Sequence, residues 1–144
     1  MRQRYAAAAV LLIASALSAC DDVTDIIPGE TYDLVQAEGQ ELPAVVFDGE
    51  LDFGHVIATA VSGSITLRET TFTERIVFDI TLDGAPLGEK SVTLTGDYSA
   101  DGPLLTFDPD PSNSPTFTGT LSGVTLTTVE TYEDYGELTF VWQR

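Results

Sequence analysis

Apolar and polar residues alternate with a period of two along most of this chain, and this alternation constrains the fold more than any other feature. Side chains of a β-strand point alternately to its two faces, so a strand with one buried face shows this pattern. In the clearest example, Thr71–Leu82, Val77 is predicted to face away from the buried side, and Glu74 interrupts the buried row near one end. That buried row is Phe72, Ile76, Phe78, Ile80 and Leu82. Because almost nothing repeats at the helical spacing, the sequence predicts an all-β fold.

Turn signals divide the alternating region into eight or nine strands. Asp-Gly and Ser-Gly pairs are typical of tight turns between antiparallel strands. The acidic stretch 48–54 is predicted as a loop, and Gly63 predicts a bulge or a sharp bend within a long strand. The alternation in that long strand places Ile57 and Ile65 on one face and Ala58 on the other. The predicted strands are Glu30–Ala37, Ala44–Asp48, His55–Leu67, Thr71–Leu82, Lys90–Ser99, Leu104–Asp108, Thr116–Leu121, Val124–Glu130 and Glu137–Trp142.

Successive hairpins of this kind predict an antiparallel up-and-down meander. A long meander has exposed edges unless it closes on itself, and about eight strands close into a barrel. We therefore expect a closed barrel over residues 30–144, with a two-sheet β-sandwich as the alternative.

The alternation also predicts what fills the barrel. Nine aromatic side chains are expected to face inward, and an eight-stranded barrel offers little more room than its side chains need. Gly96 and Gly119 fall on the same inward face, where a small cleft is expected. We therefore expect a mostly filled barrel that binds at its rim and acidic loops. The nine aromatic residues are Tyr32, Phe47, Phe72, Phe78, Tyr98, Phe107, Phe117, Phe140 and Trp142.

Residues 1–19 have the zones of an export signal: a basic start with Arg2 and Arg4, an apolar run, and small residues before Cys20. Leu17-Ser18-Ala19-Cys20 resembles the lipobox of bacterial lipoproteins. The resemblance implies that residues 1–19 are removed and that Cys20 receives lipid, including palmitate-type chains, which anchor the protein firmly. An ordinary cleaved signal and a retained transmembrane helix are the alternatives, but the apolar run is shorter than the roughly 20 residues that such a helix needs.

Charge and cysteine content limit the partners of the exported part. The whole chain carries a formal net charge of −17, and removal of two arginines with the signal would make the remainder more negative. Such charge disfavours nucleic acid and favours basic partners. Cys20 is the single cysteine, so no disulfide is expected. We expect residues 20–29 to form a lipidated acidic tether on the extracytoplasmic or periplasmic side of a membrane of the bacterial cell envelope.

Several segments resemble the small lipocalin-like domains of bacterial lipoproteins. Residues 29–35 with 41–45 resemble the start of such domains, residues 62–67 resemble an inner strand, and residues 140–144 resemble the closing strand. The chain departs from that pattern after Thr66-Leu67, where Arg68-Glu69 replaces the usual Asn or Asp-Gly turn, and at Tyr32, where lipocalins place a tryptophan. The resemblance implies a lipocalin-like barrel without implying a ligand.

The sequence contains few candidates for catalysis or metal binding. His55, the single histidine, lies at a strand start and lacks a G-x-S-x-G partner, so we interpret it as a surface residue. Residues 108–112 offer alternating oxygen atoms but lack the glycine and distal glutamate of a calcium loop. An acidic cluster at residues 130–137 is interpreted as a solvated hairpin tip. We therefore expect no enzyme activity, no cofactor, no metal and no catalytic residues.

Three functions stay open at this point. The first is a non-catalytic binding module that holds a small apolar ligand or a protein partner. The second is an envelope scaffold whose barrel is filled. The third is an inhibitor of a basic envelope enzyme, attracted by the acidic surface.

Overall fold

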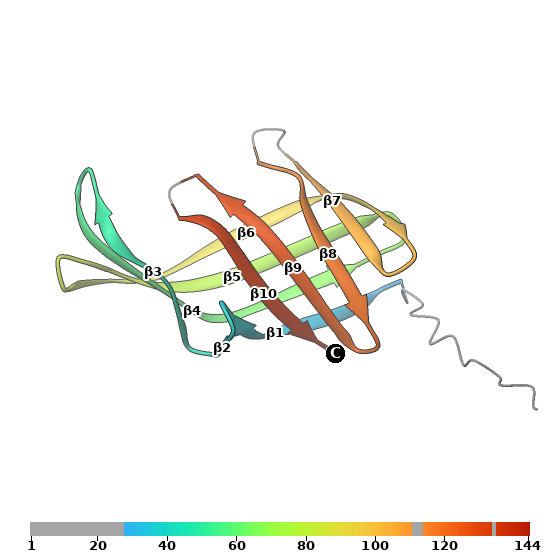
Figure 1. The fold of residues 1–144 in the computed structure, drawn as a ribbon, viewed down its shortest axis with the longest axis horizontal. Coiled ribbons are helices and arrows are strands. Elements are labelled where there is room, and N and C mark those ends of the chain that lie inside the picture. The colour runs from blue at the N-terminus through green and yellow to red at the C-terminus, as the bar shows by residue number, and fades with distance from the viewer. Residues whose placement is uncertain (1–27, 111–113, 134) are drawn as a thin grey trace, which may run out of the picture.

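The computed structural model describes residues 28–110, 114–133 and 135–144, and these residues form ten β-strands and no helix (Figure 1). Cys20, the lipobox and most of the predicted tether lie outside the described residues. The described part contains no helix that is long and apolar enough to span a membrane. The strands are β1 (Glu30–Ala37), β2 (Gln40–Glu41), β3 (Ala44–Leu51), β4 (Gly54–Leu67), β5 (Thr71–Leu82), β6 (Ala85–Asp101), β7 (Leu104–Asp110), β8 (Phe117–Ser122), β9 (Thr125–Tyr132) and β10 (Gly136–Gln143).

The strands form one antiparallel meander that closes into a barrel. Strands β4 to β10 pair in chain order, β10 pairs with β1, and β1 pairs with β4 to complete the circle. Eight strands therefore make the barrel, while β2 and β3 add to it from outside the circle. The predicted all-β, closed barrel is confirmed, and the alternative of a two-sheet sandwich is wrong. This architecture is compatible with a lipocalin-like barrel.

Strand β4 pairs along one edge with both β1 and β3. Its last residues pair with β1 and its first residues pair with β3. The pairing with β5 shifts between Ala60 and Ser62, which is a bulge close to the bend predicted at Gly63. A bulge adds one residue to one strand and so reverses which residues face inward. Ala58 is therefore fully buried before the bulge and Ile65 after it, and the prediction that Ile57 shares the inward face with Ile65 is wrong.

Two hairpins are longer than the sequence predicts. β3 continues to Leu51 through the stretch predicted as an acidic loop, and β6 begins at Ala85 rather than Lys90. Figure 1 shows the β3–β4 and β5–β6 hairpins reaching past the rest of the barrel on the same side. Acidic residues are compatible with these strands because the side chains on one face stay exposed to water.

The core is the barrel interior, and it is filled mainly by aromatic and branched side chains. Seven of the nine predicted inward aromatic residues are buried, and the other two, Phe47 and Tyr98, are partly buried against the core. The rings of Phe72, Phe107 and Phe117 contact one another, with centroid separations of 4.6–5.7 Å. Val77 is also buried, at 6% exposure, although it lies outside the core cluster. The opposite face of β5 is therefore covered at this position, which the alternation did not predict.

The two ends of the barrel differ, and we name them for what they contain. The packed end lies near the turns 68–70, 102–103 and 123–124, where β1 begins and β10 ends. The cavity end is the opposite end, near the segment 114–116 and the end of β9.

Candidate binding site

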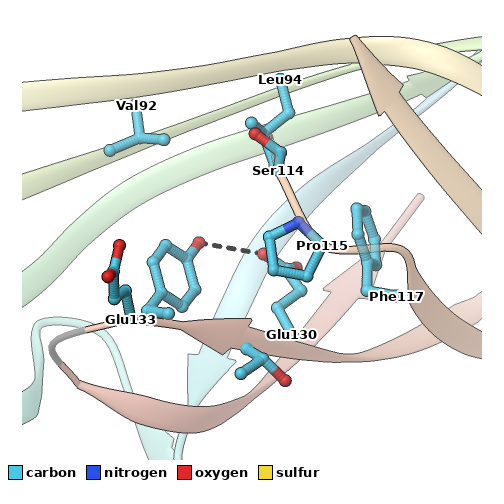
Figure 2. Close-up of a pocket in the computed structure, with 9 residues that line it drawn as sticks. Val92, Leu94, Ser114, Pro115, Phe117, Glu130 and Glu133 are labelled. Carbon is cyan, nitrogen blue, oxygen red and sulfur yellow. Dashed lines mark hydrogen bonds between the residues drawn. The ribbon is translucent and has the colours of Figure 1, made fainter. Parts of the chain in front are cut away.

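A cavity of about 240 Å³ lies at the cavity end, between β6 on one side and β8 and β9 on the other. Figure 2 shows Val92 and Leu94 on β6, across the cavity from Glu133, Glu130 and Pro115. Most of the lining is apolar, and Glu130 is the buried acidic residue among it. A largely apolar cavity with a few polar groups is the usual form of a small-molecule site.

Strand pairing explains why the cavity is at this place. The ladder between β6 and β7 ends at the pair Thr95 and Asp110, and the ladder between β8 and β9 starts at Thr118 and Val129. Beyond these pairs the inward side chains of β6 and β9 face each other without the ladders of β7 and β8 between them. The residues after Val129 on β9 and those before Thr95 on β6 therefore form the two walls of the cavity.

A hydrogen-bonded network built on alternate residues of β9 lies beside the cavity. Thr128 Oγ1 donates to Glu130 Oε1 over 2.9 Å, and Tyr132 Oη donates to Glu130 Oε2 over 2.9 Å. Trp142 Nε1 on β10 donates to Thr128 Oγ1 over 3.0 Å. The three β9 residues share the inward face because side chains two apart point the same way. Both oxygens of Glu130 are thus fixed by hydroxyl donors.

Glu74 on β5 brings a second carboxyl group to the same network. Its side chain is 1% exposed and lies within hydrogen-bonding contact of Glu130, which is 3% exposed. Burial, together with the nearby negative charge of Glu130, raises the pKa of Glu74 well above its ordinary value. Burial also raises the pKa of Glu130, although hydrogen bonds from Thr128, Tyr132 and Glu74 oppose that effect. The geometry therefore favours a protonated Glu74 that donates to an ionised Glu130.

The negative charge of this pair has no basic partner among the residues that the structure describes. The ion pair found in the described residues is His55 Nε2 with Asp48 Oδ1, at 2.9 Å on the β3–β4 hairpin, and neither residue lines the cavity. Oε2 of Glu74 also has no hydrogen-bond partner within the described part of the chain. A buried charge without a counter-charge is costly, so this arrangement is the strongest candidate for a functional site.

The sequence interpretation of the acidic cluster at residues 130–137 is wrong for Glu130. Glu130 is buried and hydrogen-bonded, whereas Glu133 and Glu137 are exposed, and Asp134 lies outside the described residues. The alternation already indicated this position. Glu130 has the same parity as the fully buried Leu126, which means that an even number of positions separates them and that they share a face of the strand. Glu74 has the same parity as Phe72 in this sense. Parity shows that both carboxyl groups face inward, but it does not show that they meet.

The cleft predicted beside Gly96 and Gly119 is found in part among the described residues. An open hollow of about 320 Å³ touches Gly96, together with exposed residues such as Thr73 and Asp97, but Gly119 does not line it. Both glycines are buried as expected, but a side chain at Gly96 would collide with the backbone of Asp108. At Gly119 the first side-chain atom would lie 3.1 Å from Leu126 and from Phe107. The two glycines therefore allow close packing, and the cavity between β6 and β9 is a separate space that neither of them lines.

Other candidates from the sequence contribute no comparable site. His55 is 38% exposed, and its Nε2 contacts Asp48. Asp108 and Asp110 lie at exposed positions of β7, while residues 111–113 lie outside the described part. Within the described residues, no group of three or more His, Cys, Asp or Glu side chains could hold a metal ion.

Comparisons with known proteins add no family assignment. Neither a family model, nor a curated protein, nor a solved structure matches this chain.

Proposed function

We propose that this protein is a non-catalytic binding module of the bacterial cell envelope, held at a membrane by lipid on Cys20, which binds a small ligand in the cavity between β6 and β9. The observation that supports the binding role is the mostly apolar cavity beside a buried carboxyl pair, at one end of an otherwise filled barrel. The support for anchoring is the lipobox-like sequence that ends at Cys20.

The filled interior favours binding in this cavity over binding in the barrel centre. A carrier of long apolar ligands needs a lumen of several hundred cubic ångströms. Here the centre of the barrel is occupied by Phe72, Phe107, Phe140 and Trp142, which are at most 1% exposed. The 240 Å³ cavity suits a compact ligand about the size of a single six-membered ring.

The binding role is tested by filling the cavity. Ligand-detected NMR would be recorded on the full protein, processed by its host and solubilised in dodecyl maltoside. The probes would be cyclohexanol and cyclohexylamine. We expect at least one probe to bind, and Val92→Trp to reduce that binding at least tenfold because the indole occupies the cavity. The matched control is Thr93→Trp, an exposed position next along β6. Absence of binding by both probes would contradict the binding role.

The anchoring is tested separately by labelled palmitate. We expect Cys20→Ala to abolish incorporation of the label and to leave the signal segment uncleaved by the lipoprotein peptidase. Labelling of the variant at the level of the unmodified protein would show that the lipobox interpretation is wrong.

A further inference from the structure

We infer that the cavity between β6 and β9 selects a small organic cation, an ammonium group on a compact apolar body, with the ammonium held by Glu130. This inference rests on the proposed binding role of the same cavity and adds the chemical class of the ligand. It starts from the combination of an apolar cavity and a buried acidic pair that no basic side chain of the described residues neutralises.

The charge of the pair is the first argument. Glu130 lies on the cavity wall at 3% exposure and receives two hydroxyl hydrogen bonds, which satisfy its oxygens without cancelling its charge. Attraction between opposite charges is strong where water is excluded. A cation in the cavity would therefore gain from a charge that the folded protein already keeps buried.

The unpartnered oxygen of Glu74 is a second feature that favours a ligand with hydrogen-bond donors. Oε2 of Glu74 is buried and has no donor among the described residues, while an ammonium group carries three N–H donors. Glu74 is not among the residues that line the cavity, but it contacts Glu130, which does. An ammonium group beside Glu130 would therefore supply the positive charge that the pair lacks and would bring donors next to the residue that Glu74 contacts.

The remaining walls distinguish an organic cation from a metal ion. Val92, Leu94 and Phe117 offer apolar surface, and the polar lining besides Glu130 and Tyr132 is Ser114, Thr131 and Glu133. Calcium takes six to eight oxygen ligands, and no group of three or more acidic, His or Cys side chains in the described residues could hold a metal ion. The same surface suits a hydrocarbon body, and the rings of Phe117 and Tyr132 add faces that attract cations. The net charge of −17 further raises the local concentration of cations around the protein.

The first test compares probes of one shape and different charge on the unmodified full chain in dodecyl maltoside. Isothermal titration would measure cyclohexylamine, cyclohexanol and cyclohexanecarboxylate at pH 7, where the amine is protonated because its pKa is close to that of lysine, ~10.4. We expect cyclohexylamine to bind at least tenfold more tightly than cyclohexanol, and the carboxylate to bind more weakly than either. If cyclohexanol binds as tightly as the amine, the binding role stands and the cation inference is overturned. If no probe binds, both are overturned.

The second test locates the preference. Glu130→Gln keeps the side-chain shape and can still hydrogen-bond to Thr128 and Tyr132, but it removes the charge. We expect the preference for amine over alcohol to fall below threefold in Glu130→Gln, while cyclohexanol still binds. Glu89→Gln, an exposed position on β6 outside the cavity, is the control and should keep the preference within twofold of the unmodified protein. An equal loss in both variants would show that surface charge as a whole attracts the amine, and this would overturn the site.

Discussion

The packed end and the cavity end of the barrel are built from the same strands but filled in opposite ways. On β5, Phe72 at the packed end contacts the rings of Phe107 and Phe117, with centroids 5.1 and 5.7 Å away. Two residues further along the same face, Glu74 meets another carboxyl group and is the beginning of the cavity end. One inward row of one strand thus passes from close apolar packing to a buried polar network.

This difference separates the part of the fold that is stabilised by apolar packing from the part on which the proposed binding role rests. Aromatic packing needs no specific partner atoms, whereas a buried polar group must be hydrogen-bonded or it costs free energy. The network that runs from Trp142 through Thr128 to Glu130 and Tyr132 meets that requirement, except at Oε2 of Glu74. The packed end therefore depends on apolar packing for its stability, whereas the cavity end depends on hydrogen bonds to a buried charge.

The largest effect is expected at the packed end. Phe72→Asp would place a charge among aromatic rings, and we expect it to lower the free energy of unfolding by more than about 4 kcal/mol. The neighbouring Thr73 is exposed, so Thr73→Asp should cost less than about 1 kcal/mol. Chemical denaturation of both variants measures the difference. Similar losses in the two variants would mean that β5 is not oriented as described.

A smaller effect is expected in the network of the cavity end. Thr128→Val keeps the shape of the side chain but leaves Trp142 Nε1 without its acceptor and Glu130 Oε1 without its donor. We expect a loss of about 2–3 kcal/mol, because buried polar groups would lose their partners. Thr127→Val, on the opposite face of β9, serves as the control and should change stability little. A Thr128→Val variant as stable as the Thr127→Val variant would show that the network is not a stabilising feature.

A still smaller effect is expected when the pH is varied: the free energy of unfolding should change only slightly for each pH unit. The pKa of Glu74 is higher in the folded than in the unfolded protein, so its stabilising contribution is complete below the ordinary glutamate pKa of about 4.3 and is lost as the pH rises through the raised pKa. Glu74→Gln imitates the protonated form and lacks this loss. We expect the unmodified protein to lose stability relative to Glu74→Gln as the pH rises, by at most about 1.4 kcal/mol per pH unit.

Denaturation at several pH values between 4 and 8 tests this expectation against a control. Glu69→Gln removes an exposed carboxyl from the turn before β5 and should leave the pH profile close to that of the unmodified protein. A constant difference between the unmodified protein and Glu74→Gln would show that Glu74 does not hold its proton more tightly in the folded state.

Much of the packed end could be predicted from the sequence, because alternation alone assigns residues to the two faces of a strand. The aromatic residues of β5, β7 and β8 face inward as their parity indicates. The assignment failed in the first half of β4, because a bulge between Ala60 and Ser62 reverses the inward face there. A bulge depends on pairing between strands, which the order of residues in one strand does not determine.

The cavity end could be predicted only in part for the same reason. Parity places Glu74 and Glu130 inside, yet they lie on β5 and β9, which do not pair with each other. Their contact depends on how the barrel closes and on the stagger of its strands. The acidic composition around Glu130 also suggested a solvated turn, which hid its buried position.

Titration of the carboxyl pair formed by Glu74 and Glu130 tests the proposed site most directly. Carbon-13 NMR of the side-chain carboxyl groups of labelled glutamates, assigned with Glu74→Gln and Glu130→Gln, would follow the protonation of the pair between pH 3 and 9. We predict that at least one apparent pKa of the pair lies well above the ordinary glutamate value of about 4.3. If both carboxyl groups of the pair titrate at that ordinary value, the pair is not buried and the proposed site is wrong.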